Sequence, residues 1–168
     1  MTETDPDQSR AYSAQEGAEE FFSGHGTIAD PMVGLEPEGV IEFARATLDL
    51  LSENAREPPN FELGMAEGDP RAGRYDFERD VIQLHPYQLN RWRVLHEMAH
   101  WFDPAARLGH PGHGPRFRTI HCFLVSAALG DEAGGKLAEM YRIDGVPIEA
   151  DISWAEAILP NSDAREGI

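Results

Sequence analysis

Residues 89–102 read LNRWRVLHEMAHWF, and this stretch organises the rest of the chain. Its apolar residues lie on nearly all sides of a helix, so the pattern predicts a helix that is buried on most of its surface. Asp103-Pro104 ends this helix, because proline cannot continue it. A helix buried in this way needs other elements around it, and the flanking sequence supplies them.

The flanking sequence predicts further helices and three short strands. Two of the strands alternate on either side of Glu78-Arg79-Asp80, which is typical of a hairpin. The expected elements are helices at 37–56, 89–102, 115–129 and 132–142, and strands at 61–65, 74–77 and 81–84. This order predicts an α+β fold, in which a small antiparallel sheet packs with the buried helix and with flanking helices.

The negative charge of the chain is concentrated at its ends. The 168 residues carry 14 basic and 30 acidic side chains, for a net charge of −16. Residues 1–30 and residues 131–168 each carry a net charge of −6, whereas residues 31–130 carry −4. We therefore expect one domain at 31–145, with an acidic arm before it and an acidic tail at 146–168.

The acidic arm, residues 1–30, lacks sustained helical or strand periodicity and is rich in acidic and small residues. This composition predicts a mostly disordered segment that can be removed without unfolding the domain. Docking on the domain through Phe21-Phe22 is the alternative.

Composition excludes several classes of protein. A single cysteine, Cys122, rules out a disulfide framework and a zinc module built from paired cysteines. The acidic N-terminus does not resemble a signal peptide, and no apolar run reaches 18 residues, so we expect a cytoplasmic protein without a membrane partner. The negative charge argues against nucleic acid as the main partner.

The motif His96-Glu97-Met98-Ala99-His100 gives the predicted buried helix its chemistry. One helical turn separates His96 from His100, so both imidazoles can reach one metal ion. Glu97 lies beside them, where its carboxylate can take a proton from a water on the metal without being a ligand. The pattern therefore indicates a zinc hydrolase, with two ligands and a general base on one turn.

A catalytic zinc site needs a third protein ligand and one open position. The downstream candidates are Asp103, His110, His113 and His121. Asp103 could instead end the helix or form a hydrogen bond to one of the ligands. His110 lies in a Gly/Pro loop, where a histidine is typically exposed to solvent. His113 begins the next helix, where the chain can fold back onto the first. His121 lies two turns further on, either beside the site or in the core.

The pair of motifs HEMAH (96–100) and HGPRF (113–117) resembles the SprT-like zinc metallopeptidases, whose mark is HExxH followed by HGxxF on the next helix. It is also similar to a family of small actinobacterial HExxH metallohydrolases that have a short hairpin before the HExxH helix. The resemblance covers residues 37–130 and implies a zincin-like fold. It further implies the zinc ligands His96, His100 and His113, the catalytic acid–base Glu97, and Phe117 packed beneath the site.

We therefore expect a zinc-dependent hydrolase with one Zn²⁺ per chain, most simply a metallopeptidase acting on a peptide or protein substrate. The alternative is a non-catalytic, zinc-stabilised interaction protein. Glu97 favours catalysis, because a structural zinc site has no use for it and uses four protein ligands.

Metzincins, and endoribonucleases with HxxxHxxxxxH spacing, would need a third histidine at position 106, which is Ala106. The sequence does not specify an oligomeric state.

Overall fold

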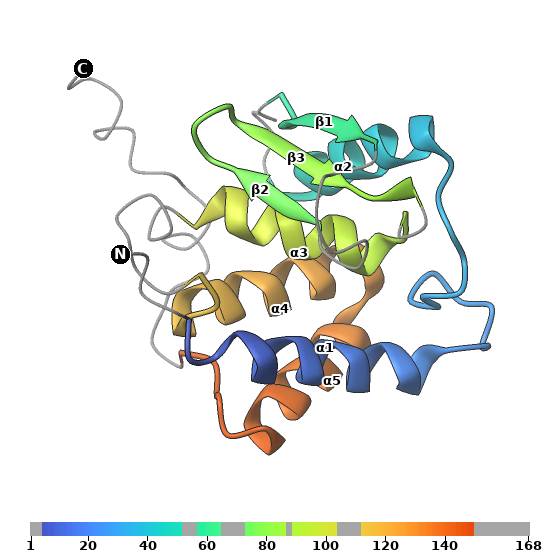
Figure 1. Ribbon diagram of the computed structural model, residues 1–168. Helices are drawn as coiled ribbons and strands as arrows, with labels where there is room; N and C mark the ends of the chain where they lie inside the picture. Colours follow the sequence, from blue (N-terminus) through green and yellow to red (C-terminus); the bar gives the residue numbers. More distant parts are fainter. Residues whose placement is uncertain (1–4, 52–56, 65–72, 87–88, 104–111, 150–168) are drawn as a thin grey trace.

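The computed structural model describes residues 5–51, 57–64, 73–86, 89–103 and 112–149. Within these ranges the chain forms five helices and three short strands, which confirms the predicted α+β class. Figure 1 shows them in chain order: α1 (Gln8–Phe22), α2 (Pro37–Leu51), β1 (Asn60–Leu63), β2 (Arg74–Asp76), β3 (Val81–Leu84), α3 (Arg91–Phe102), α4 (Pro115–Leu129) and α5 (Asp131–Ile143).

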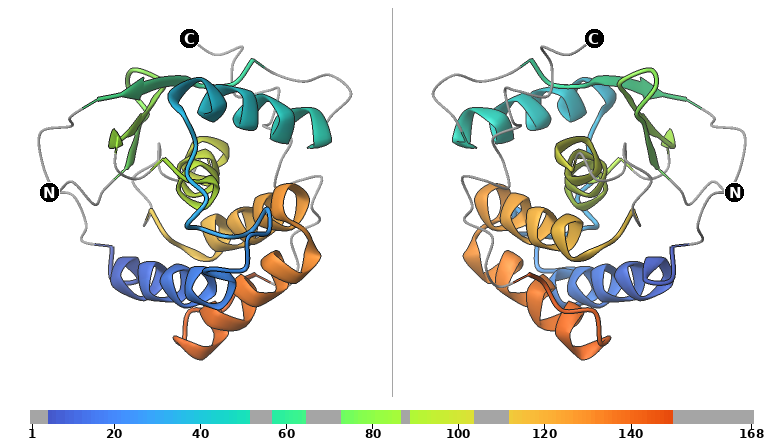
Figure 2. Two further views of the ribbon diagram at one scale, coloured as in Figure 1. Left: turned by 90° about the vertical axis from the view of Figure 1, so that its right-hand side faces the viewer. Right: turned by 90° about the vertical axis from the view of Figure 1, so that its left-hand side faces the viewer.

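Helix α3 lies at the centre of the molecule, as its apolar pattern predicts. Both views of Figure 2 look along its axis, with the sheet and α2 on one side and α1, α4 and α5 on the other. The Asn90 side chain caps the helix by accepting a hydrogen bond from the Arg93 backbone N–H. Its fully buried apolar residues are Trp92, Val94, Leu95, Met98 and Ala99. Side chains on α3 are therefore shielded from solvent unless they face an opening.

The sheet has the order β1-β3-β2 and is mixed rather than antiparallel. The predicted hairpin of β2 and β3 is confirmed, with Asp80 in the left-handed region at its turn (φ 53°). Strand β1 pairs with β3 in the parallel direction, which corrects the prediction of an antiparallel sheet. Apolar alternation gives the faces of a strand but not its direction, which depends on the path of the connecting chain. Among the described strands β3 is central, and β2 forms an edge.

The N-terminal region differs from the predicted disordered arm, because residues 8–22 form α1 and pack against α5. A Cβ on Gly17 would lie 2.4 Å from Met140 Cε of α5, so the two helices approach closely at this position. Phe22 also packs near Trp92 of α3, with ring centroids 6.2 Å apart. The buried residues of α1 are Ala11, Ala14, Gln15, Ala18 and Phe22. A face made mostly of alanine has low hydrophobicity, which is why periodicity did not reveal it.

The acidic tail was predicted to begin at residue 146, and its first residues pack on α4. Val146 is buried, and the Glu149 backbone N–H donates to Thr119 Oγ1 at 2.9 Å. The rest of the predicted tail, residues 150–168, lies outside the described residues. In the part of the chain that the structure describes, no helix has the length and apolar character needed to cross a membrane.

Candidate metal centre

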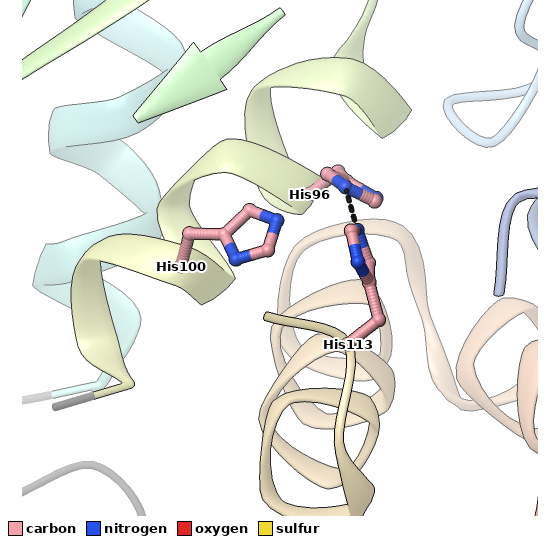
Figure 3. Close-up of side chains that lie close together, drawn as sticks. All are labelled: His96, His100 and His113. Atoms are coloured by element: carbon pink, nitrogen blue, oxygen red, sulfur yellow. Dashed lines mark hydrogen bonds between the residues drawn. The ribbon is translucent and has the colours of Figure 1, made fainter. Parts of the chain in front are cut away.

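The three histidines predicted as ligands meet between α3 and the start of α4 (Figure 3). His96 and His100 lie one turn apart on α3, and His113 lies two residues before α4. One nitrogen from each lies within 4.8 Å of the others, close enough to bind a single metal ion. His96 Nε2 and His113 Nε2 lie 3.2 Å apart. His96 and His113 are buried, and His100 is half-buried.

Phe117 of α4 packs against all three imidazoles. Its ring stacks on His100, with centroids 4.2 Å apart and planes at 29°, and meets the rings of His96 and His113 edge-on at 5.0 and 4.9 Å. Phe117 is fully buried in the first turn of α4, which begins at Pro115. The second motif therefore supplies both a candidate ligand and the apolar base of the site.

Two residues that sequence reasoning missed form hydrogen bonds to the Nδ1 atoms of two candidate ligands. His96 Nδ1 lies 2.7 Å from Gln15 Oε1 of α1, and His113 Nδ1 lies 2.7 Å from Asp5 Oδ2. The Gln15 amide nitrogen donates to the Glu19 carboxylate, so the Gln15 oxygen faces His96. Only the position of Gln15 on an otherwise alanine-lined face could have signalled this contact.

These contacts fix where the protons of the two imidazoles lie. Gln15 Oε1 and the Asp5 carboxylate are acceptors, so Nδ1 of His96 and Nδ1 of His113 both donate. In two neutral imidazoles, the lone pairs of both Nε2 atoms would then face each other across 3.2 Å. Such an arrangement needs a cation between the nitrogens, either a proton or a metal ion.

The surroundings disfavour protonation of the cluster. Burial lowers the pKa of His96 and of His100 well below the ordinary value, and the neighbouring histidines lower it further. Tetrahedral zinc with bonds of about 2.0–2.1 Å places its nitrogen ligands about 3.3 Å apart, close to the observed 3.2 Å between His96 Nε2 and His113 Nε2. The residues present therefore fit a metal ion bound by imidazole nitrogens.

Glu97 is buried beside this cluster. Burial raises the pKa of its carboxyl to about 8, against the lowering effects of Arg93 and of a hydrogen bond from the Tyr75 backbone. Among the described residues, Glu97 Oε2 has no hydrogen-bond partner. Oε1 lies under the strand edge, where a Cβ on Gly73 would approach it to 2.9 Å, so only glycine fits there without a shift. A buried carboxylate with a free oxygen can accept a proton from a molecule in the site.

A pocket of about 270 Å³ opens over these groups, between α1 and the β2–β3 hairpin. Tyr12 of α1 forms part of its wall and stacks on His96, with ring centroids 5.2 Å apart and planes at 14°. The lining residues are Gln8, Tyr12, Gly73, Arg74, Tyr75, Phe77, Glu97, His100 and His113. Glu97 and two candidate ligands, His100 and His113, are therefore reachable from outside.

The other candidate ligands lie elsewhere or outside the described residues. His121 is fully buried, its Nδ1 lies 2.9 Å from the Tyr141 hydroxyl, and it is not part of the three-histidine cluster. Asp103 is buried at the end of α3, with its Oδ1 3.7 Å from Arg116 Nε. His110 falls outside the part of the chain that the structure describes. Of the two alternatives for His121, the structure supports a core histidine packed behind His96.

Comparisons of the chain with protein-family models, with curated proteins and with solved structures found no match. The similarity to SprT-like metallopeptidases therefore stays a prediction from the two motifs.

Proposed function

We propose that the protein is a zinc-dependent metallopeptidase of zincin-like architecture, with one Zn²⁺ per chain held by His96, His100 and His113. The observation that carries this proposal is the pair of opposed Nε2 atoms, 3.2 Å apart and buried beside Glu97, whose Oε2 has no partner within the described part of the chain. A core that only packed histidines would not need Glu97 at the floor of an open pocket. The combination matches a hydrolytic zinc site better than a structural one, which uses four protein ligands.

Glu97 carries the proton transfers of the proposed reaction. When bound, zinc supplies Lewis acidity, which lowers the pKa of a water and polarises the carbonyl of the substrate. Glu97 Oε2 accepts the proton of the attacking water and then delivers it to the leaving amine.

Strand β2 offers a place for an extended peptide. It is the edge of the described sheet nearest the pocket, and Arg74 and Tyr75 line the opening beside Glu97. A peptide that adds to this edge by backbone hydrogen bonds would bring its carbonyl groups over the metal centre. Residues 81–84, the strand that immediately precedes α3, do not offer such an edge, because they form the central strand β3 of the described sheet.

We propose that the Tyr12 hydroxyl contacts the substrate on the side of the pocket opposite β2. Burial and the nearby Glu97 carboxylate raise the pKa of Tyr12, so the hydroxyl keeps its proton at neutral pH. A protonated hydroxyl on the pocket wall can donate a hydrogen bond to an oxygen that gains negative charge during the reaction.

Hydrolysis of a peptide library by the zinc-loaded wild type and by Glu97→Gln tests the proposal. The variant keeps the shape of the side chain but cannot accept a proton, so we expect full zinc content and a rate at least about 100-fold lower. Glu16→Gln, the same change on the exposed face of α1, is the matched control and should cleave like the wild type.

Equal cleavage by Glu97→Gln and the wild type would contradict the proposed role of Glu97. If neither protein cleaves any peptide, while removal of zinc unfolds both, the non-catalytic zinc-stabilised interaction protein is the correct alternative.

A further inference from the structure

The N-terminal segment, residues 5–22, contacts the metal centre from a direction that neither motif predicts. Two of its side chains, Gln15 and Asp5, accept hydrogen bonds from the Nδ1 atoms of His96 and His113. We propose that Gln15 and Asp5 are positioning residues of the metal centre, so that the N-terminal segment sets how tightly the protein holds its metal. The inference rests on the metal site of the proposed function, but not on peptidase activity.

Gln15 is a polar side chain at a position where an apolar residue would pack better. It is fully buried on a helix face otherwise formed by alanines and Phe22, where an apolar side chain would pack without needing a hydrogen-bond partner. Its amide is satisfied at both ends, with the nitrogen donating to Glu19 and the oxygen accepting from His96. The Glu19 contact holds the amide in the orientation that keeps Nε2 of His96 free for a metal.

Asp5 holds His113 through two bonds. One oxygen, Oδ2, accepts from the ring Nδ1 at 2.7 Å and from the backbone N–H of the same residue at 2.9 Å. The pair fixes both the ring and the chain that carries it. A carboxylate on the far nitrogen of a metal-binding imidazole also makes the near nitrogen a stronger electron donor.

Arg118 ties the N-terminal segment to the part of the chain that carries His113. Its side chain is buried on α4, and Nη1 donates to Asp7 Oδ2 at 3.0 Å and to the His113 carbonyl at 2.6 Å. Nε of the same guanidinium donates to the Pro147 carbonyl at 3.2 Å. Asp5 therefore approaches His113 from a segment that is anchored two residues later, and not from a loose chain end.

These contacts divide the metal centre between two parts of the fold. The motifs on α3 and α4 supply the ligands, and the N-terminal segment orients two of the three. Because the bonds to Gln15 and Asp5 exist only when this segment is docked, its docking and the binding of metal must strengthen each other.

Metal affinity, measured by competition with a chromogenic chelator, tests the inference directly. Gln15→Met and Asp5→Ala each remove one acceptor, and we expect each to weaken Zn²⁺ binding about 10- to 100-fold, the usual effect of losing such a partner. The double variant Gln15→Glu/Glu19→Gln keeps an acceptor toward His96 and a donor–acceptor contact between positions 15 and 19, and it should restore binding to within a few-fold of the wild type. The visible spectrum of the Co²⁺-loaded protein should change in the two acceptor-free variants, because their ligand geometry relaxes.

Tyr141→Phe is the matched control. It removes the hydroxyl next to Nδ1 of His121, a buried histidine that packs beside His96 but lies outside the three-histidine cluster. We expect it to lower stability without changing zinc affinity. If Gln15→Met does not fold, Asp5→Ala decides the matter, because Asp5 precedes α1 and contributes nothing to its buried face.

Unchanged Zn²⁺ affinity in Asp5→Ala and in a folded Gln15→Met would overturn the inference, even if both melt at lower temperature. A wild type that binds neither Zn²⁺ nor Co²⁺ would overturn both the inference and the proposed function. A wild type that binds zinc tightly, with the expected losses in the variants but no peptidase activity, would support the inference and contradict the proposed function.

Discussion

Helices α3 and α1 both reach the metal centre, but they differ in how much their sequences reveal. Helix α3 presents His96, Glu97 and His100 at a spacing that indicates metal chemistry on its own. Helix α1 has an acidic, alanine-rich sequence without a motif, yet its Gln15 binds His96 and its Tyr12 covers the same ring. The comparison teaches that ligands are recognisable from residue type and spacing, whereas the groups that orient them are recognisable only once the chain has folded.

Removal of residues 1–22 should have the largest effect, because it tests whether α1 belongs to the domain at all. The deletion removes Phe22 and three buried alanines from the core, and truncation of a buried phenylalanine alone costs about 3–5 kcal/mol. That loss is comparable to the whole stability of a typical domain, about 5–15 kcal/mol. We expect a truncated protein that no longer unfolds cooperatively, measured by circular dichroism. A truncated protein with an unchanged melting temperature would contradict this expectation and support the removable, disordered arm predicted from composition.

His113→Ala and His121→Ala should separate a ligand from a core histidine. We expect His113→Ala to lose its zinc after dialysis, because two imidazoles on one helix turn bind far more weakly than three. His121→Ala should keep one zinc per chain but lose about 2–4 kcal/mol of stability, since it leaves a cavity behind His96. Metal analysis and urea unfolding measure the two effects. Zinc retained in His113→Ala and lost in His121→Ala would reverse the assignment.

Acid should destabilise the metal-free protein through the histidines of α3 and α4. Burial lowers the pKa of His121 to about 3, and it lowers the pKa of His96 and of His100 well below the ordinary histidine value of about 6.5. The unfolded chain therefore binds more protons than the folded one below pH 6.5, so this contribution to stability is full above that pH and declines as the pH falls toward the folded pKa values.

From His121 alone we expect a loss of about 2 kcal/mol between pH 6.5 and 5, at about 1.4 kcal/mol per unit. Urea unfolding of chelator-treated protein at a series of pH values measures this loss. The measurement is made on Glu97→Gln, because the raised pKa of Glu97 stabilises the folded protein as the pH falls and would offset this loss. In this variant, stability that is flat from pH 7 to pH 5 would show that the buried histidines gain protons as readily in the folded protein as in the unfolded chain.

Tyr12→Phe should have the smallest effect and tests what α1 contributes to the pocket itself. The change removes only a hydroxyl, so we expect unchanged zinc content and a kcat about tenfold lower, the value of one hydrogen bond worth about 1.5 kcal/mol. The control is Tyr141→Phe, which removes a buried hydroxyl that does not line the pocket and should leave kcat unchanged. Equal rates for Tyr12→Phe and the wild type would show that the Tyr12 hydroxyl of α1 does not contact the substrate.

Local pattern determined much of the fold and the identity of the candidate metal ligands. The buried helix α3, the β2–β3 hairpin and the bounds Pro115–Leu129 of α4 follow from periodicity and from the prolines and glycines that end each element. The ligands on α3 are one turn apart, so the geometry of a single helix brings them together. Sequence spacing works here because the interacting groups are close along the chain.

Tertiary structure alone decided the direction of β1, the docking of α1 and the partners of the ligand histidines. Gln15 is 81 residues from His96, and Asp5 is 108 residues from His113. Hydrogen-bond acceptors such as these are common throughout an acidic chain, and residue type does not show which of them will reach an imidazole. That choice is made by the close packing of an alanine face against α5 and by the Arg118 contacts that hold the N-terminal segment in place.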